Sequence, residues 1–371
     1  MPETKPPPPK WKGICRLLFQ YDVGQRVDVD RCTTLIAGHP ARIHQDHRAP
    51  VWFQFNPPPF QMVEEIASVE IGGRWTTTAL TAVVYEFGAV SVSYDLPFEA
   101  SLPEIVELSC SLQQENPLWA ESRAQVQRIL EAIRPAITKL SLATPTEDYA
   151  IFQVEQVDPS ISLQDLSRLH GLELAQILRG ERGALSSEEI AEAVESPVSY
   201  GPDDIAWIDW QAALLVGKGW GDVRAVLEFA SVQLLEMRFL DGKLDEALDR
   251  SYETLSARPR PWLLPARGLP VEILRVARMQ VDAAILFERV INTLKLLGDQ
   301  YLARVYRIAS RQFGLPEWNS TILRKLETVD SIYQKLNDRA EARRMEVLEW
   351  IIIVLIAVSM LLPFLTGVAG H

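Results

Sequence analysis

The segment "TTTALTAVVYEFGAVSVSYDL", residues 76–96, decides which kind of fold the chain can adopt. β-Branched and aromatic residues lead up to Phe87, a turn falls near Gly88, and apolar side chains then alternate from Val90 to Tyr94. Alternation with a period of two is typical of strands with one buried face, and glycine is typical of the tight turn between them. The segment therefore predicts a β-hairpin.

Strand patterns recur through the first 220 residues and are separated by helical ones. Short apolar or alternating runs predict strands at residues 14–21, 51–55, 149–157 and, as a pair, 204–217. Leu, Val and Ile at three- and four-residue spacing predict helices at 102–114, 118–140, 162–179 and 186–194. We therefore expect one α+β domain at residues 13–220, preceded by an extended, disordered Pro-rich lead at residues 1–12.

The pattern becomes helical from Asp222 onward. Val223, Leu227 and Ala230 begin an apolar stripe at helical spacing, while Glu236 and Arg238 fall on the other faces. Residues 221–349 are therefore expected to form a helical domain, a bundle or coiled-coil stalk.

The last helix of this domain carries a heptad-like seam. Its members are Ile322, Leu326, Val329, Tyr333, Leu336, Ala340, Arg343, Val347 and Trp350. Two interpretations remain open, because such a seam can pack back on the preceding helices or associate in parallel with the same helix of another copy.

The stretch from Trp350 to Gly370 contains 21 residues and no Asp, Glu, Lys, Arg or His. A helix of that length reaches about 30 Å, the thickness of a bilayer core, so residues 350–370, with Ile351, Ile352 and Ile353 in the lipid, are predicted to be a transmembrane tail anchor. Arginines precede the stretch and none follows it, which predicts a single-pass membrane protein with its bulk in the cytoplasm. The membrane would be a bacterial inner membrane, or an organelle inner membrane in a eukaryote.

Composition limits the possible partners. The 371-residue chain has a formal net charge of −12, which makes direct binding of nucleic acid an unfavourable interpretation. Its three cysteines are widely spaced and match no metal-binding or disulfide pattern. No cofactor is predicted, and the expected partners are the lipid bilayer and either further copies of the chain or a membrane-proximal protein.

Three segments together resemble a known family. They are "VVYEFGAVSV" at 83–92, "VLEFASVQLLEMRFLDGKLDEALDRSYETL" at 226–255 and "RAEARRMEVLEWIIIVLIAV" at 339–358. In order and spacing they resemble the required-for-meiotic-nuclear-division family, whose shared domain is domain of unknown function 155. The resemblance implies a membrane-bound protein that assembles into large complexes, and a mitochondrial relative is tied to organellar translation. It implies no catalytic residues.

Two short stretches are candidate binding sites. His39, His44 and His47 could approach a metal ion, although prolines flank the stretch and a polar surface loop is the competing interpretation. The glycine-rich stretch 217–221, with Gly217, Lys218, Gly219 and Gly221, could cradle a phosphate between a strand and a helix. It lacks the Ser or Thr of a Walker loop, so a tight connecting loop is the competing interpretation there.

No catalytic motif is found in the sequence, which contains neither a Gly-x-Ser-x-Gly elbow nor a His-Glu-x-x-His helix. The main hypothesis is therefore a non-enzymatic, tail-anchored scaffold or regulatory protein that forms oligomers. One alternative is a membrane-tethered phosphate or nucleotide binder, or an enzyme, that uses the glycine-rich stretch. The other, drawn from the family resemblance, is a protein that tethers ribosomes or RNA.

Overall fold

The computed structural model describes residues 9–36, 58–113, 117–144, 146–158, 162–256 and 300–367, together with a few single positions between 274 and 288. Side chains of the last helix are described as far as residue 360. The chain divides into two compact units. The first is drawn from residues 1–239 and 286–319, and the second from residues 240–285 and 320–371.

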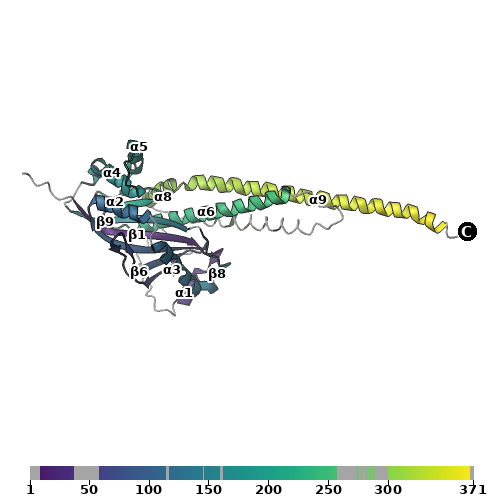
Figure 1. Ribbon diagram of the computed structural model, residues 1–371, viewed down its shortest axis with the longest axis horizontal. Coiled ribbons are helices and arrows are strands. Elements are labelled where there is room, and N and C mark those ends of the chain that lie inside the picture. Colours follow the sequence, from purple (N-terminus) through teal and green to yellow (C-terminus); the bar gives the residue numbers. More distant parts are fainter. Residues whose placement is uncertain are drawn as a thin grey trace, which may run out of the picture. The chain divides into compact units, whose positions relative to one another are not determined.

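A seven-stranded sheet forms the centre of the first unit (Figure 1). In spatial order its strands are β10 (Ile205–Ile208), β11 (Ala212–Val216), β9 (Thr146–Asp158), β1 (Lys10–Asp22), β7 (Ala89–Ala100), β6 (Ala79–Val84) and β3 (Phe60–Glu65). Neighbouring strands are antiparallel, apart from the parallel pair β9 and β11. The long strand β1 lies at the middle, between β7 and β9.

The hairpin predicted from residues 76–96 is confirmed as β6 and β7. The two strands pair from Leu80 with Tyr94 to Val84 with Val90, and the N–H of Tyr85 donates to the carbonyl of Ala89 at 2.9 Å. Gly88 in the turn has a φ of +106°, a conformation that costs glycine little because it has no Cβ.

Five helices line one face of the sheet. They are α1 (Val29–Ile36), α2 (Leu102–Gln113), α3 (Leu118–Ile133), α4 (Leu166–Arg179) and α5 (Ser187–Val194). The predicted helix 118–140 is too long, since a 3-10 turn (Arg134–Ala136) follows α3 and β8 (Ile137–Thr138) then pairs with β2 (Arg26–Val27). Pro135 lies in that turn, and proline cannot supply the N–H that an α-helix needs there.

Side chains between these helices and the sheet form the largest apolar core. Phe19 of β1 packs edge-on against Trp119 of α3, with ring centroids 5.3 Å apart. Phe98 of β7 packs similarly against Phe152 of β9 at 6.3 Å, and Phe152 is fully buried. We refer to this side of the sheet as the apolar face.

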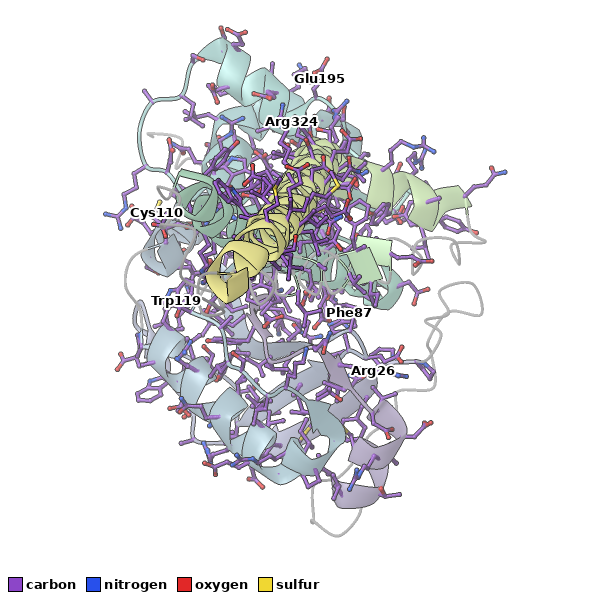
Figure 2. All side chains as sticks on the ribbon, turned by 90° about the vertical axis from the view of Figure 1, so that its right-hand side faces the viewer. Arg26, Phe87, Cys110, Trp119, Glu195 and Arg324 are labelled. Carbon is purple, nitrogen blue, oxygen red and sulfur yellow. The ribbon has the colours of Figure 1, made fainter. Side chains whose placement is uncertain are left out.

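The other side of the sheet carries α6 (Gly221–Ser256) and α8 (Gln300–Gln312). Phe229 and Val232 of α6 pack with Tyr85 and Phe87, next to Tyr306 of α8. Phe87 and Trp119, which pack on opposite faces of the sheet, are both labelled in Figure 2. We refer to this side as the α6 face.

The second unit contains the later part of α6 and most of α9 (Leu315–Gly367). Buried side chains on both helices include Leu240, Leu244, Ile322, Val329 and Ile332. Lys325 of α9 contacts Asp241 at 2.6 Å and Asp245 at 2.7 Å, so these parts of α6 and α9 lie side by side (Figure 1). The first part of the heptad-like seam is therefore packed within its own chain.

The structure confirms a mixed α+β fold with a large sheet. The strand predicted at residues 51–55 lies outside the described residues. A small hairpin of β4 (Glu70–Ile71) and β5 (Arg74–Trp75), which sequence patterns did not indicate, is also present.

The predicted membrane anchor is contradicted. Within the described part of the chain, no helix combines the length and the apolar character that crossing a bilayer requires. The residues predicted to enter the lipid, Trp350, Ile351, Ile352 and Ile353, lie within α9. Residues 368–370 of the predicted span lie outside the described residues. The same finding contradicts the predicted single-pass membrane localisation.

Candidate functional site

The α6 face of the sheet carries an unusual row of buried polar side chains. Leu17, Phe19 and Tyr21 of β1 belong to the apolar core, so the alternate residues of the same strand point toward α6. Two of these alternate residues are Gln20, which is fully buried, and Asp22, which is 3% exposed. Burying such groups costs free energy unless partners satisfy them, so each of them requires an explanation.

An ion pair occupies one end of this row. The guanidinium of Arg16 donates through Nε and Nη2 to the two carboxylate oxygens of Asp95, each at 2.7 Å. The strands β1 and β7 place these two residues directly opposite each other. A bidentate pair of this kind fixes both side chains, because two parallel hydrogen bonds define one geometry.

Helix α6 brings further charged groups over the row. Burial raises the pKa of Glu228, although the nearby hydroxyl of Ser91 and the charges of Arg16 and Arg224 oppose the shift. One guanidinium N–H of Arg238 donates to Glu147 of β9 at 2.6 Å. These contacts show that α6 lies on the sheet through charged and polar groups as well as through Phe229 and Val232.

Helix α8 adds a neutral contact to the same face. The hydroxyl of Tyr306 donates to Oε1 of Gln233, a fully buried α6 residue, at 2.7 Å. Burial raises the pKa of Tyr306 to about 12, although hydrogen bonds with Ser310 and Gln233 oppose the shift. Tyr306 therefore acts as a hydrogen-bond donor that ties α6 to α8.

Glu236 differs from the other acidic residues of this face. Its side chain is 1% exposed, and neither carboxyl oxygen has a hydrogen-bond partner among the described residues. Burial raises the pKa of Glu236 well above its usual value, and the nearby charge of Asp22 raises it further. Within the part of the chain that the structure describes, the buried amide of Gln20 also has no hydrogen-bond partner at either atom. The pair of Glu236 and Asp22, with Gln20 on the same strand face, is the candidate functional site.

The chemistry available at this pair is the holding and release of a proton. Two carboxyl groups in a buried environment disfavour each other's ionisation, which agrees with the raised pKa of Glu236. Among the described residues, no group of three or more His, Cys, Asp or Glu side chains is placed to hold a metal ion.

A second charged cluster, around Arg179 of α4, lies elsewhere in the first unit. Its guanidinium contacts Glu189 and Glu192 of α5 and, at 3.3 Å, Asp209 between β10 and β11. Burial raises the pKa of Asp209, although Trp210 and Arg179 donate hydrogen bonds to it. The cluster joins helices to the end of the sheet, and its groups satisfy one another.

A surface hollow of about 320 Å³ lies beside β2 and α1. Arg26, labelled in Figure 2, lines it and forms an ion pair with Glu86 at 2.6 Å. Asp28 also lines it and accepts the N–H of Arg31 at 3.0 Å, which caps α1. Arg26, Glu86 and Asp28 of this hollow therefore have partners within the chain.

The glycine-rich stretch lies where the sequence places it, between β11 and α6. The N–H of Gly217 donates to the carbonyl of Val154 at 2.9 Å, and a Cβ at Gly217 would lie 2.8 Å from the carbonyl oxygen of Asp203. Gly217 therefore serves the packing of the loop. Lys218, Gly219 and Gly221 are exposed, with φ of +84° at Gly219. Phosphate binding by this loop stays a prediction, and the nearby Asp203 and Asp204 disfavour an anion there.

The remaining predicted site residues fall into three groups. His39, His44 and His47 lie outside the described residues. Val329 is buried, and Leu326 and Tyr333 are partly buried, whereas the side chain of Leu336 is not among those described. Trp350, Ile351, Ile352 and Ile353 are each about half exposed.

Sequence patterns missed the buried pair. The helical spacing places Glu236 away from the apolar stripe of α6, yet the side chain is buried because α6 is covered on more than one side. A usable signal was present on the strands, where Arg16, Gln20, Ser91 and Ser93 form a polar second face that a long helix could cover.

Comparisons with known proteins identify one relative. A family model described as "Uncharacterized protein MJ0711, N-terminal domain" matches residues 12–222 of this chain. Uncharacterized protein MJ0711 of Methanocaldococcus jannaschii is 24% identical over 192 residues, which cover 51% of this chain and 58% of the relative. The chain therefore spans less than two thirds of that protein. No solved structure matches the chain.

These comparisons contradict the resemblance to the required-for-meiotic-nuclear-division family. Only the first of the three segments that suggested it, residues 83–92, lies within the matched residues. The other two are parts of long helices, in which regularly spaced Leu, Ile and Val arise in unrelated families for reasons of packing. The ribosome-tethering alternative depended on that resemblance and loses its basis.

Proposed function

We propose that this chain, which belongs to the family of the N-terminal domain of uncharacterized protein MJ0711, is a non-enzymatic scaffold that assembles with further copies of itself through α9. The observation that supports the proposal most is the exposure of apolar side chains along α9. Met345, Val347 and Leu348 are 66%, 50% and 58% exposed, and the large apolar side chains from Trp350 to Met360 are exposed as well. A contiguous apolar surface of this kind is typical of an interaction site.

The direction of these side chains favours several copies over one partner helix. Consecutive residues of an α-helix point about 100° apart, so Ile351, Ile352 and Ile353 face three different directions. All three are exposed to a similar extent. A single partner helix covers one stripe only, whereas a bundle of identical helices covers more of the circumference.

The sequence just before this apolar segment is compatible with self-association. Residues 337–349 carry both signs of charge, with Asp338, Glu341, Glu346 and Glu349 interspersed among three arginines. A helix of mixed charge can place acidic residues against basic residues of its own copy, which a helix of one sign cannot. Ile332 is the last buried residue among the described side chains of α9, and the proposed assembly segment lies beyond it.

The mass of the full chain in solution tests the proposal. Analytical ultracentrifugation of the purified protein is expected to give a mass several times that of one chain. The double variant Leu348→Glu/Ile352→Glu, which places two charges on one side of α9, is expected to sediment as a single chain. Leu169→Glu makes the same change at a 56%-exposed residue of α4 and serves as the control. A monomeric wild-type protein, or an unchanged mass for the double variant, would contradict the proposal.

A further inference from the structure

We propose that the copies assembled through α9 lie parallel and in register, with Met345, Leu348, Ile352 and Leu355 facing the interior of the bundle. We refer to these four residues as the assembly seam. This inference rests on the proposed assembly and adds its direction and its register. Because α9 begins at Leu315, within the first unit, the chain itself joins every first unit to the N-terminal end of α9. Parallel copies therefore carry their first units at the same end of the bundle.

The assembly seam is an exposed stripe with heptad spacing. Its members follow one another at intervals of three, four and three residues, which are the intervals between positions a and d of a coiled coil. In chain order they are 66%, 58%, 55% and 62% exposed. Ile352 falls at position a, and Leu348 and Leu355 fall at position d, a combination that packs well between parallel helices.

The heptad-like seam of the earlier part of α9 is offset from the assembly seam. Continued into an assembly, the heptad-like seam would place Arg343 in the interior, where a charge without a partner costs free energy. On the assembly seam, Arg343 takes position f, which points away from the other copies. From Met345 to Leu355, the interior positions of the assembly seam contain no charged residue.

Two charged residues flank the assembly seam and favour the parallel direction. Arg344 falls at position g and Glu349 at position e of the next heptad. In a parallel, in-register coiled coil, position g of one helix meets this position e of its neighbour, so the two opposite charges pair between copies. Within one helix, residues five apart point about 140° away from each other, so the same two residues do not pair within a chain.

Antiparallel copies can bury the assembly seam in two registers, and both place charges badly. If Met345 lies level with Leu355 of the other copy, positions e meet each other and Glu349 lies next to a second Glu349. If Ile352 lies level with Leu355, Glu349 lies next to Ile356 and has no cation beside it. A carboxylate that loses water without gaining a partner costs free energy, so the parallel arrangement is favoured over both.

The flanking positions become apolar further along α9. Ile351 at position g, Ile356 at position e and Val358 at position g are 49%, 54% and 47% exposed. Apolar residues at e and g widen the face that each helix can bury, and a wider face suits a bundle of several helices. Beyond Trp350, the parallel register is therefore compatible with more than two copies.

Distances between spin labels on different copies test the direction. The full chain is labelled at Asp338→Cys or, as the control, at Val354→Cys. Asp338 is exposed and Val354 is 51% exposed, whereas the three native cysteines are buried. In parallel copies both labels should give distances below about 30 Å, since neighbouring helices lie about 10 Å apart and the label arms add the rest.

Antiparallel copies would give a different pair of distances. Labels at residue 338 would then be separated by about 36 Å or more along the axis, whereas labels at residue 354 would stay within about 12 Å along it. A short distance at residue 354 with a long one at residue 338 would overturn the parallel arrangement and leave the assembly itself standing. No distance between copies at either residue, together with the mass of one chain, would overturn the proposed function as well.

Reversing the flanking charges tests the register. Arg344→Glu and Glu349→Arg should each raise the dissociation constant of the assembly about threefold or more, because each brings like charges together. The double variant Arg344→Glu/Glu349→Arg should restore it. Glu346→Arg, at the outward position b, is the control and should assemble as the wild type does. A double variant that assembles as weakly as the single variants would overturn the register.

Discussion

The two faces of the central sheet are stabilised in different ways. On the apolar face, aromatic and aliphatic side chains of five helices pack against β1, β7 and β9. On the α6 face, the same strands present Arg16, Gln20, Asp22 and Glu147 to a helix that brings its own carboxylates. Burial of apolar area stabilises the first face at any pH, whereas the second depends on partners and protons. The first face is therefore suited to hold the fold, and the second to respond to conditions.

Removing a large side chain from the apolar face is expected to have the largest effect. Phe152→Ala deletes a fully buried ring that packs against Phe98, and it should lower the free energy of unfolding by about 3–5 kcal/mol. Urea unfolding at neutral pH measures the change. The control Trp75→Ala changes a residue that is 58% exposed, and it should lower the free energy of unfolding by much less. A loss below about 1 kcal/mol for Phe152→Ala would show that the apolar face is not the main core.

Breaking the ion pair on the α6 face is expected to have an intermediate effect. Arg16→Met leaves Asp95 without its bidentate partner and should cost about 2–3 kcal/mol, less than for a fully buried pair because the two side chains are 22% and 25% exposed. Urea unfolding of the double variant Arg16→Met/Asp95→Leu is expected to recover part of this loss, since no unpaired charge remains. If the double variant loses as much as the sum of the two single variants, the pair is not coupled as described.

Asp148, an acidic residue beside the apolar face, allows a further test of how pH affects stability on the two sides of the sheet. Asp148 is opposite Phe19 in the pairing of β9 with β1, and burial followed by the charge of Glu147 raises its pKa to about 6. Its folded pKa lies above its unfolded pKa, so the folded protein loses stability as the pH rises from about 4 to about 6. Asp148→Asn should remove that loss and stabilise the protein above pH 6 by about 1–3 kcal/mol.

Urea unfolding at about pH 4.5 and pH 7 measures this prediction, with the exposed Asp203→Asn as the control. The stabilisation should be larger at the higher pH. Equal effects at the two values would mean that Asp148 titrates in the folded chain as it does in the unfolded one.

Local sequence patterns predicted many of the helices and strands of this fold. They did not predict which distant strands pair with each other. The hairpin around Gly88 is visible in the sequence because each strand alternates and the turn residue is specific. Nothing local indicates that β11 pairs in parallel with β9, or that β2 pairs with β8, because those partners are far apart in sequence. The end of α3 was misplaced because a continued apolar spacing outweighed Pro135 in the prediction.

The sequence patterns did not predict the candidate site, for a related reason. Helical periodicity assumes one buried stripe with solvent opposite, and on that assumption Glu236 is a surface residue. Between Val226 and Met237, α6 is buried on several sides, so periodicity could not separate the covered faces from solvent. A buried carboxyl group can be recognised only once the elements that cover it are known.

The central place of β1 has a consequence for synthesis on the ribosome. Its hydrogen-bonding partners are β7 and β9, and β9 begins about 120 residues after β1 ends. At roughly 5–20 residues per second, β1 emerges about 6–25 seconds before its second partner exists. During that interval an alternating apolar strand of 13 residues has an unpaired edge, so the nascent chain is expected to rely on chaperones until β9 appears.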